Sequence, residues 1–387
     1  MKRFKRDIET VLNDAVADGQ TSCASVLIWH GDEEAQFHLS GFADLDENKP
    51  IARDSIFRLY SLTKPMTAVA AATLIERGKL DLVAPVSDFL TGFKDQKVAL
   101  NDTETESVKR AVQIRDLFTM TSGLPYPGEA SPAERRMLEL YKQMETEIDE
   151  GRKLTTIDAA NRIGQVPLAH QPGEQWLYGT SADVLGAVIE VVSGKTLNEY
   201  MAETIFEPLG MADTDFFVHE DKRERLVTMY ERKDSALVKH PFNDKLHGVF
   251  SLPDVLEGGA GIYSTIDDVM TFGRMLLGSG KLKKTRILSQ NAVDWLSENH
   301  LTDKQLEYFN WDSVLGYGYG GLMRVMLSPG RSFSLGAKGE FGWDGWTGTY
   351  MSVCPQKKMV LVVMQQLADA GTNGVIRKLR NVIYANI

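Results

Sequence analysis

The sequence predicts an α+β fold in which one sheet is built from both ends of the chain and a helical segment is inserted between them. Two observations lead to this prediction. Residues 24–41 and three runs between residues 317 and 366 are rich in β-branched and aromatic side chains. Most of the sequence between residues 80 and 235 instead has apolar side chains at helical spacing.

The N-terminal elements are predicted from their apolar spacing. Residues 4–18 form a helix with one buried face that ends at Asp18-Gly19. Residues 24–41 follow as a β-hairpin, because polar and apolar side chains alternate after a turn at residues 31–34. A further helix begins at Ser61 and ends at Gly78. Its apolar side chains lie on several sides, so we expect it to be buried in the middle of the protein.

The middle of the chain is predicted to be mostly helical. A charged helix covers residues 131–150, a shorter helix covers residues 155–164, and a long helix with an apolar face covers residues 181–205. Residues 219–245 carry many charges and little periodicity, which predicts a surface loop or a charged insertion.

The last third returns to strands. The sequence Gly258-Gly259-Ala260-Gly261 predicts a close approach of backbone before a helix at residues 266–277. Strands are predicted at residues 317–325, 349–354 and 359–366, with a turn at residues 355–358 between the last two. A helix over residues 371–384 completes the chain.

Composition and charge exclude several classes of protein. Of the 387 residues, 43% are apolar and 25% are charged, which is ordinary for a globular protein. The formal net charge of -10 argues against nucleic-acid binding, which needs a clustered basic face. Cys23 and Cys354 are too few for a disulfide scaffold or a four-ligand zinc site, and the seven histidines do not cluster. We therefore expect no metal ion and no organic cofactor.

The expected location is the cytoplasm. The basic N-terminus continues into an amphipathic segment rather than the unbroken apolar core of a secretory signal. No run reaches the length of about 18 apolar residues that a membrane span requires, so no membrane partner is expected. The oligomeric state stays open.

The strongest chemical signal is Ser61-Leu62-Thr63-Lys64. Ser61 and Lys64 are three residues apart at the start of a predicted helix, so their side chains share one face. A neutral amine in that place takes the proton of the hydroxyl, and the helix N-terminus favours developing negative charge. The chain has no Gly-x-Ser-x-Gly motif, which argues against an α/β-hydrolase.

Two further motifs contain groups suited to acyl chemistry. Tyr178 lies in a Gly-rich turn ahead of a helix, and its phenol can share and pass a proton beside a lysine. The sequence Gly342-Trp343-Asp344-Gly345-Trp346 leads into a strand. Gly345 lets substrate lie against the backbone, and an edge amide there completes an oxyanion hole with the amide of Ser61.

In this order the three motifs resemble the serine β-lactamase and penicillin-binding-protein superfamily, whose Ser-x-x-Lys motif comes first. The similarity is greatest to the class C β-lactamase-like branch, especially the family VIII carboxylesterases, and it covers nearly the whole chain. The resemblance implies a β-lactamase/transpeptidase-like fold with a mainly antiparallel sheet flanked by helices. It implies a discontinuous sheet domain (residues 1–79 and 236–387), a mainly helical domain (residues 80–235) and an active site in the cleft between them.

The resemblance also implies roles for individual residues. Ser61 is the nucleophile, Lys64 helps to deprotonate it, and Tyr178 is the partner in proton transfer. The segment Trp343-Asp344-Gly345 takes the place of a Lys-Thr-Gly motif, and the amides of Ser61 and Trp346 form the oxyanion hole. Whether Lys64 or Tyr178 is the base stays open, because strongly coupled groups titrate as a pair.

Two departures from the family pattern bear on the substrate. Thr180 replaces the Asn of Tyr-x-Asn, which removes an amide that can donate and accept near the substrate. Trp343 replaces the lysine that meets the carboxylate of a β-lactam, and Asp344 adds negative charge. An anionic substrate should therefore bind poorly, which favours small neutral esters. The following aromatic residues are expected to line an acyl pocket: Tyr126, Trp176, Tyr317, Trp343 and Trp346.

Several functions compete with a carboxylesterase. They are β-lactam hydrolysis, acyl transfer to an alcohol or amine, and cleavage of D-amino-acid peptides or amides. From outside enzymes, a catalytically idle ligand-binding relative is the alternative. Ser61, Lys64 and Tyr178 occurring together argue against an idle protein.

Overall fold

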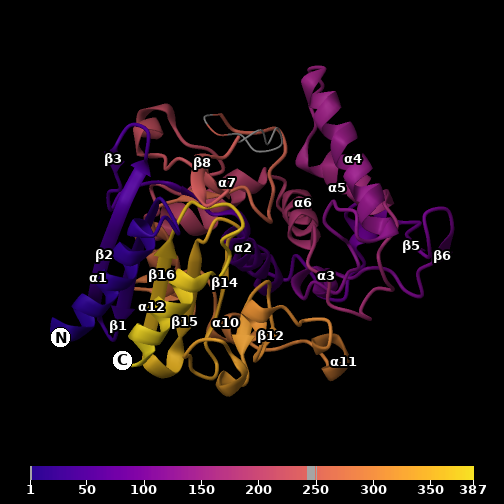
Figure 1. Ribbon diagram of the computed structural model, residues 1–387. Helices are drawn as coiled ribbons and strands as arrows, with labels where there is room; N and C mark the ends of the chain where they lie inside the picture. Colours follow the sequence, from indigo (N-terminus) through magenta and orange to yellow (C-terminus); the bar gives the residue numbers. More distant parts are fainter. Residues whose placement is uncertain (1, 242–248, 250) are drawn as a thin grey trace.

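The computed structural model describes residues 2–241, 249 and 251–387, and an eight-stranded antiparallel sheet forms its centre (Figure 1). The strands run across the sheet in the order β12 (Tyr317–Tyr319), β13 (Arg324–Met326), β14 (Phe341–Asp344), β15 (Tyr350–Cys354), β16 (Met359–Met364), β1 (Cys23–His30), β2 (Glu33–Asp44) and β3 (Lys49–Pro50). Because β1 pairs with β16, the two ends of the chain meet in the middle of the sheet. This confirms the predicted fold class.

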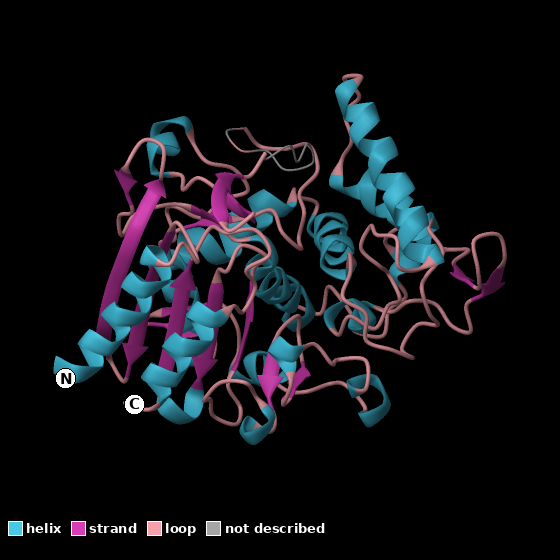
Figure 2. Cartoon of the chain, viewed as in Figure 1, coloured by secondary structure: helices cyan, strands magenta, loops and turns pink. Residues whose placement is uncertain are grey.

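Helices cover both faces of the sheet (Figure 2). Val26 and Ile28 of β1 pack into a cluster with α1 (Lys2–Ala17) and α12 (Gly374–Tyr384), and Leu27 points to the other face. On that second face, α9 (Ile266–Leu277) packs against β15, β16 and β1.

A bundle of helices beside the sheet holds the middle of the chain (Figure 1). Its members are α2 (Lys64–Glu76), α3 (Ile114–Phe118), α4 (Pro132–Asp149), α5 (Thr156–Gln165) and α6 (Ser181–Ser193). The prediction that α2 is buried is confirmed, since all of its residues from Lys64 to Leu74 are buried. It packs mainly against α6.

Short elements complete the described chain. The short helices are α7 (Leu197–Met201), α8 (Glu207–Leu209), α10 (Gln290–Leu296) and α11 (Asp303–Leu306). The two-stranded pairs are β4 (Phe57–Arg58) with β9 (Tyr263–Ser264), β5 (Lys97–Ala99) with β6 (Thr105–Ser107), β7 (Tyr230–Lys233) with β8 (Ala236–Lys239), and β10 (Lys281–Leu282) with β11 (Thr285–Arg286). None of the helices in the described residues combines the length and apolar character needed to cross a membrane.

Two predicted elements are interrupted. The long helix predicted at residues 181–205 ends at Ser193, because Gly194 adopts the left-handed conformation with φ of 70°. A new helix then begins behind a capping box formed by Thr196 and Glu199. The strand predicted at residues 317–325 is a hairpin of β12 and β13, which turns at Leu322 with φ of 57°.

One predicted loop contains regular structure. The segment 219–245 includes the β7–β8 hairpin, and Tyr230 within it is 1% exposed. The backbone of Tyr230 bonds to Gln366 and Ala368, and its hydroxyl accepts from the amide of Leu45, so this hairpin is attached beside the sheet. Residues 242–248 of the segment lie outside the described residues.

Candidate active site

Ser61 lies in a single 3₁₀ turn (Tyr60–Thr63) between β4 and α2. Tyr60 has φ of 47°, a conformation that side chains other than glycine rarely adopt. The preceding residue, Leu59, is held from both sides. Its amide donates to the carbonyl of Ile262 at 2.9 Å, and its carbonyl accepts from Thr349 Oγ1 at 2.9 Å. The turn is therefore fixed between the end of the sheet and the segment before α9.

Lys64 is completely buried directly behind Ser61. Its Nζ donates to Ser61 Oγ at 3.0 Å, to the Tyr126 hydroxyl at 2.9 Å and to the carbonyl of Gly259 at 2.8 Å. All three acceptors are uncharged oxygens. Within the described part of the chain, no carboxylate lies within ion-pair distance of this amine.

Two tyrosines flank Lys64 in different ways. The ring of Tyr178 has its centroid 4.7 Å from Lys64 Nζ, and its hydroxyl accepts a hydrogen bond from Trp343 Nε1 at 3.0 Å. Tyr126, which was expected in an acyl pocket, instead binds Lys64 with its hydroxyl. Burial raises the pKa of Tyr126 well above its ordinary value, so its phenol stays protonated at neutral pH.

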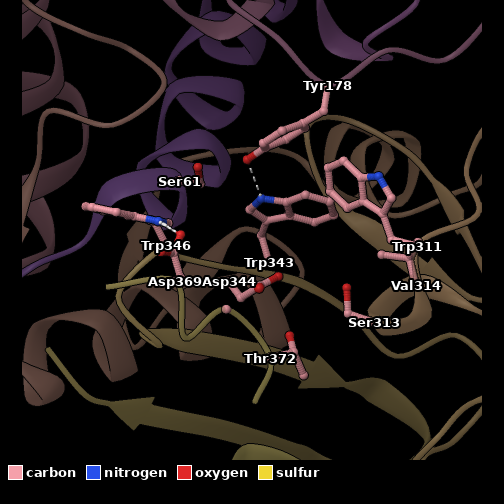
Figure 3. A pocket seen from close by; sticks show the side chains of 12 residues that line it. Ser61, Tyr178, Trp311, Ser313, Val314, Trp343, Asp344, Trp346, Asp369 and Thr372 are labelled. Atoms are coloured by element: carbon pink, nitrogen blue, oxygen red, sulfur yellow. Dashed lines mark hydrogen bonds between the residues drawn. The ribbon is translucent and has the colours of Figure 1, made fainter. Parts of the chain in front are cut away.

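A cavity of about 490 Å³ opens beside Ser61 (Figure 3). Six predicted residues line it: Ser61, Tyr178, Trp343, Asp344, Gly345 and Trp346. Six further residues complete the lining: Trp311, Ser313, Val314, Asp369, Gly371 and Thr372. The structure therefore brings together three motifs that are far apart in the sequence.

The backbone amides of Ser61 and Trp346 belong to residues that line the same cavity. Neither donates a hydrogen bond to any of the described residues. Gly345 permits their approach, because a Cβ at this position would lie 2.2 Å from the carbonyl oxygen of Leu59. Any side chain at residue 345 would push the end of β14 away from the Ser61 turn.

Asp344 carries less net charge into the cavity than the sequence predicts. Its Oδ1 accepts from Arg324 Nη1 at 2.8 Å, and Arg324 is 2% exposed. The guanidinium also donates to Thr372 Oγ1 at 3.2 Å. This buried cation partly offsets, from behind, the negative charge that the sequence predicts for Asp344.

Besides Tyr126, three predicted binding residues lie outside the cavity lining. Trp176 is 4% exposed and stacks behind Tyr178, with their ring centroids 6.0 Å apart. Thr180 is fully buried beside the carbonyl of Pro125. Tyr317 bonds through its hydroxyl to Glu340 and contacts Arg324, so it supports the buried arginine. These side chains support the lining residues from behind.

Trp311 and Asp369 are cavity residues that the motifs did not reveal. Trp311 is 43% exposed and meets the ring of Tyr178 edge to face at 5.2 Å. Asp369 follows β16 in a tight loop with φ of 58°, and its carboxylate accepts from Trp346 Nε1 at 2.6 Å. An aromatic residue in a polar segment and an acidic turn after a strand are the signals that could have indicated them.

Comparison with known proteins gives a family match over most of the chain. A family model described as Beta-lactamase matches residues 8–384. Protein Rv1367c of Mycobacterium tuberculosis is 32% identical over 359 residues, which is 90% of this chain and 86% of that protein. Esterase EstB of Burkholderia gladioli is 26% identical over 399 residues, with 98% of this chain and 94% of EstB covered.

A solved structure has the same fold. EstCE1, described as a hydrolase with promiscuous acyltransferase activity, superimposes with a TM-score of 0.81. The match covers 99% of both chains at 24% sequence identity. At this identity the likeness concerns the fold.

Proposed function

The chain belongs to the β-lactamase family, and from this premise we propose that it is a carboxylesterase that cleaves small neutral esters through an acyl-enzyme on Ser61. The family match places it among the serine hydrolases of the β-lactamase and penicillin-binding-protein superfamily. The observation that carries the proposal is the 3.0 Å contact between Lys64 Nζ and Ser61 Oγ at the wall of an aromatic cavity.

The geometry supports a two-step acyl transfer. Ser61 Oγ attacks the ester carbonyl carbon, and its proton passes to Lys64 in the neutral form of that amine. The amides of Ser61 and Trp346 stabilise the oxyanion. The alcohol leaves with a proton returned through Lys64 and Tyr178, and water then attacks the acyl-enzyme to release the acid and restore the Ser61 hydroxyl.

The residues that line the cavity favour esters over β-lactams as substrates. By the family resemblance, Trp343 takes the place of the lysine that binds a carboxylate, and its indole Nε1 is bonded to the Tyr178 hydroxyl. Among the residues that line the cavity in the described chain, none is Lys, Arg or His. An anionic substrate would therefore meet no cation in the cavity itself. The similarity to EstB supports the same choice.

The test is the initial rate of p-nitrophenyl butyrate hydrolysis by wild type and by Ser61→Ala. Loss of the nucleophile should lower kcat/KM about a thousandfold or more. Ser297→Ala, which removes a hydroxyl that bonds only within its own helical turn, is the matched control. Equal rates in wild type and Ser61→Ala would refute the proposal. Rapid turnover of nitrocefin would favour β-lactam hydrolysis instead.

Acyl transfer is the second candidate, supported by the activity named for EstCE1. The cavity is open at Trp311, which leaves room for an alcohol to approach an acyl-enzyme in place of water. Addition of a small primary alcohol should then divert product from butyric acid to the butyrate ester. Unchanged yields of free acid would exclude transfer to that acceptor.

A further inference from the structure

The lining of the cavity beside Ser61 combines two kinds of chemistry. Four aromatic side chains border it: Tyr178, Trp311, Trp343 and Trp346. Two carboxylates, those of Asp344 and Asp369, share the same space, and the lining includes no basic side chain among the described residues. Aromatic faces and carboxylates both attract positive charge.

Trp311 is an aromatic side chain that is only partly buried by the rest of the protein. It is 43% exposed although it is a large apolar side chain, and it meets Tyr178 edge to face at 82°. In the view of Figure 3, Trp343 lies between Trp346 and Trp311, and both Trp343 and Trp311 contact the ring of Tyr178. A cation over an indole face is favoured by about 0.5–2 kcal/mol, depending on how far it is desolvated.

The carboxylates of Asp344 and Asp369 place negatively charged oxygens at the cavity wall, although Asp344 shares its charge with Arg324. Arg324 pairs with Asp344 from behind and does not line the cavity, so the pair presents its negative end to a ligand. Asp369 is exposed, and the partner of its carboxylate is the uncharged indole nitrogen of Trp346. Among the described residues no basic side chain pairs with Asp369. Its charge is therefore available to a ligand.

We propose that this cavity binds a positively charged group of the substrate, so that an ester with an alkylammonium group a few bonds from its carbonyl is the preferred substrate class. This inference rests on the proposed esterase function and deepens it. Lys64 lies behind Ser61, so the ammonium group belongs in the part of the cavity away from that amine, with Trp311 on one side and Asp344 and Asp369 on the other.

The experiment compares two esters of the same shape, butyrylcholine and 3,3-dimethylbutyl butyrate, in which a neutral carbon replaces the nitrogen. For wild type, kcat/KM should be about three- to tenfold higher for the cation. The ratio of the two values is the measured quantity, since a general loss of activity leaves it unchanged. Asp369→Asn and Trp311→Leu should each bring the ratio towards one.

Matched controls lie in the segment that precedes Trp311 and outside the cavity lining. Glu307→Gln removes one exposed carboxylate, and Tyr308→Leu removes an aromatic side chain that is 39% exposed. Neither residue lines the cavity, so both variants should keep the wild-type ratio. A salt titration adds a second test, because a preference based on charge falls as NaCl is raised.

The outcomes separate this inference from the proposed function. A wild-type ratio of one or below, with both esters hydrolysed, overturns the inference and leaves the esterase intact. If neither these esters nor p-nitrophenyl butyrate is hydrolysed, the esterase proposal fails. Tetramethylammonium is then titrated against tryptophan fluorescence, with neopentyl alcohol as the neutral comparison. Equal responses to the two compounds, or no response, would overturn the inference as well.

Discussion

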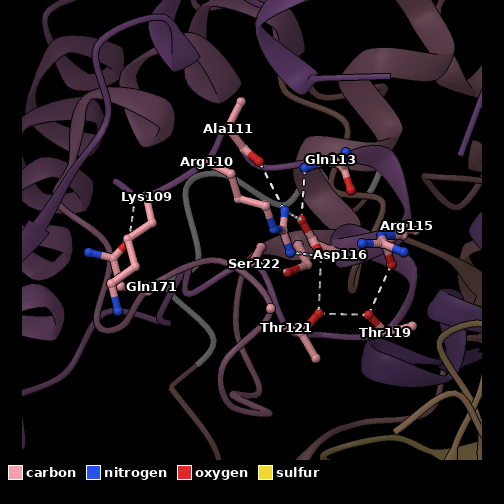
Figure 4. A network of polar contacts seen from close by, with 12 residues as sticks. Lys109, Arg110, Ala111, Gln113, Arg115, Asp116, Thr119, Thr121, Ser122 and Gln171 are labelled. Atoms are coloured by element: carbon pink, nitrogen blue, oxygen red, sulfur yellow. Dashed lines mark hydrogen bonds and ion pairs between the residues drawn. The ribbon is translucent and has the colours of Figure 1, made fainter. Parts of the chain in front are cut away.

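The described residues form a cavity of about 490 Å³ beside Ser61 and a second one of similar volume beside Arg110, and the two differ in how the charged groups near them are paired. In the cavity beside Ser61, the nearby amine of Lys64 is held by three uncharged oxygens. In the second cavity, Arg110 makes two hydrogen bonds to the carboxylate of Asp116, at 2.6 and 2.9 Å (Figure 4). Volume therefore does not distinguish a reactive site from a structural one.

The second cavity is built for stability. Asp116 also accepts from the amide of Gln113, which forms the capping box that begins α3. Its hydrogen bonds raise the pKa of Arg110 and keep the pair charged. A group whose protons are fixed in this way cannot easily exchange them with a substrate. Lys64 instead bonds to the Ser61 hydroxyl, which can transfer its proton. Variants near Ser61 should therefore lose mainly activity, and variants of the Arg110–Asp116 pair should lose mainly stability.

Lys64→Met is the variant with the largest expected effect on activity, and it tests whether Lys64 serves catalysis rather than stability. We expect kcat/KM for p-nitrophenyl butyrate to fall about a thousandfold or more, because Ser61 loses its proton acceptor. The free energy of unfolding in urea should change by about 1 kcal/mol or less, since a buried amine without a carboxylate partner contributes little net stability. A variant that unfolds readily and retains its activity when folded would contradict the assignment.

Tyr178 and Tyr126, the two tyrosines that flank Lys64, should differ in their contribution to catalysis. Tyr178→Phe should lower kcat about a hundredfold, because its hydroxyl lies in the cavity and passes the proton to the leaving alcohol. Tyr126→Phe should lower kcat only about tenfold, since its raised pKa keeps it a neutral partner of Lys64. Pre-steady-state rates of p-nitrophenol release measure both. Equal losses would mean that Tyr126 takes part in proton transfer.

Arg110→Met is the converse test in the second cavity. Asp116 is 2% exposed, and loss of the arginine leaves its carboxylate with backbone and hydroxyl partners alone. We expect unfolding to become easier by about 2 kcal/mol, because the Arg110 side chain is itself one-third exposed. The value of kcat/KM should stay within about twofold of wild type. A large loss of activity without loss of stability would make this cavity part of the function.

The fold was predictable where the pattern is local. The β-forming side chains of β1, the alternating side chains of β2 and the continuous apolar run of β16 predicted the sheet from both chain ends. The strand β14, only four residues with a glycine and an aspartate, gave no such signal. It exists because β13 and β15 pair with it on both sides. Tertiary pairing decides such short elements.

The site was predictable to the extent that motifs carry it. Ser61, Lys64, Tyr178, Trp343 and Trp346 come together as expected. Trp311 and Asp369 were missed, since they lie in loops whose position depends on distant elements. The direction of a side chain was also beyond the sequence. Tyr126 was predicted to face the substrate, but its hydroxyl turns to Lys64.

Asp268 on α9 provides the test with the smallest expected effect on activity, because it is a partly buried charge outside both cavities. Burial raises its pKa to about 6, against the opposing hydrogen bonds from the amide of Asp213 and the hydroxyl of Thr214. The folded state therefore binds the proton more tightly than the unfolded state. Stability should fall as the pH rises from about 4 to 6, by up to about 3 kcal/mol.

Asp268→Asn should remove this fall while its amide oxygen keeps both hydrogen bonds. Urea unfolding at pH 4.5, 5.5 and 7 measures the slope, and kcat/KM at pH 7 should be unchanged. The neighbouring Asp267→Asn, which loses an exposed ion pair with Arg53, is the control and should keep the wild-type slope. If Asp268→Asn also kept that slope, another group would set it. If Asp268→Asn altered kcat/KM, the charge of Asp268 would influence catalysis from outside the cavity. The distinction between residues that determine activity and residues that determine stability would then be wrong.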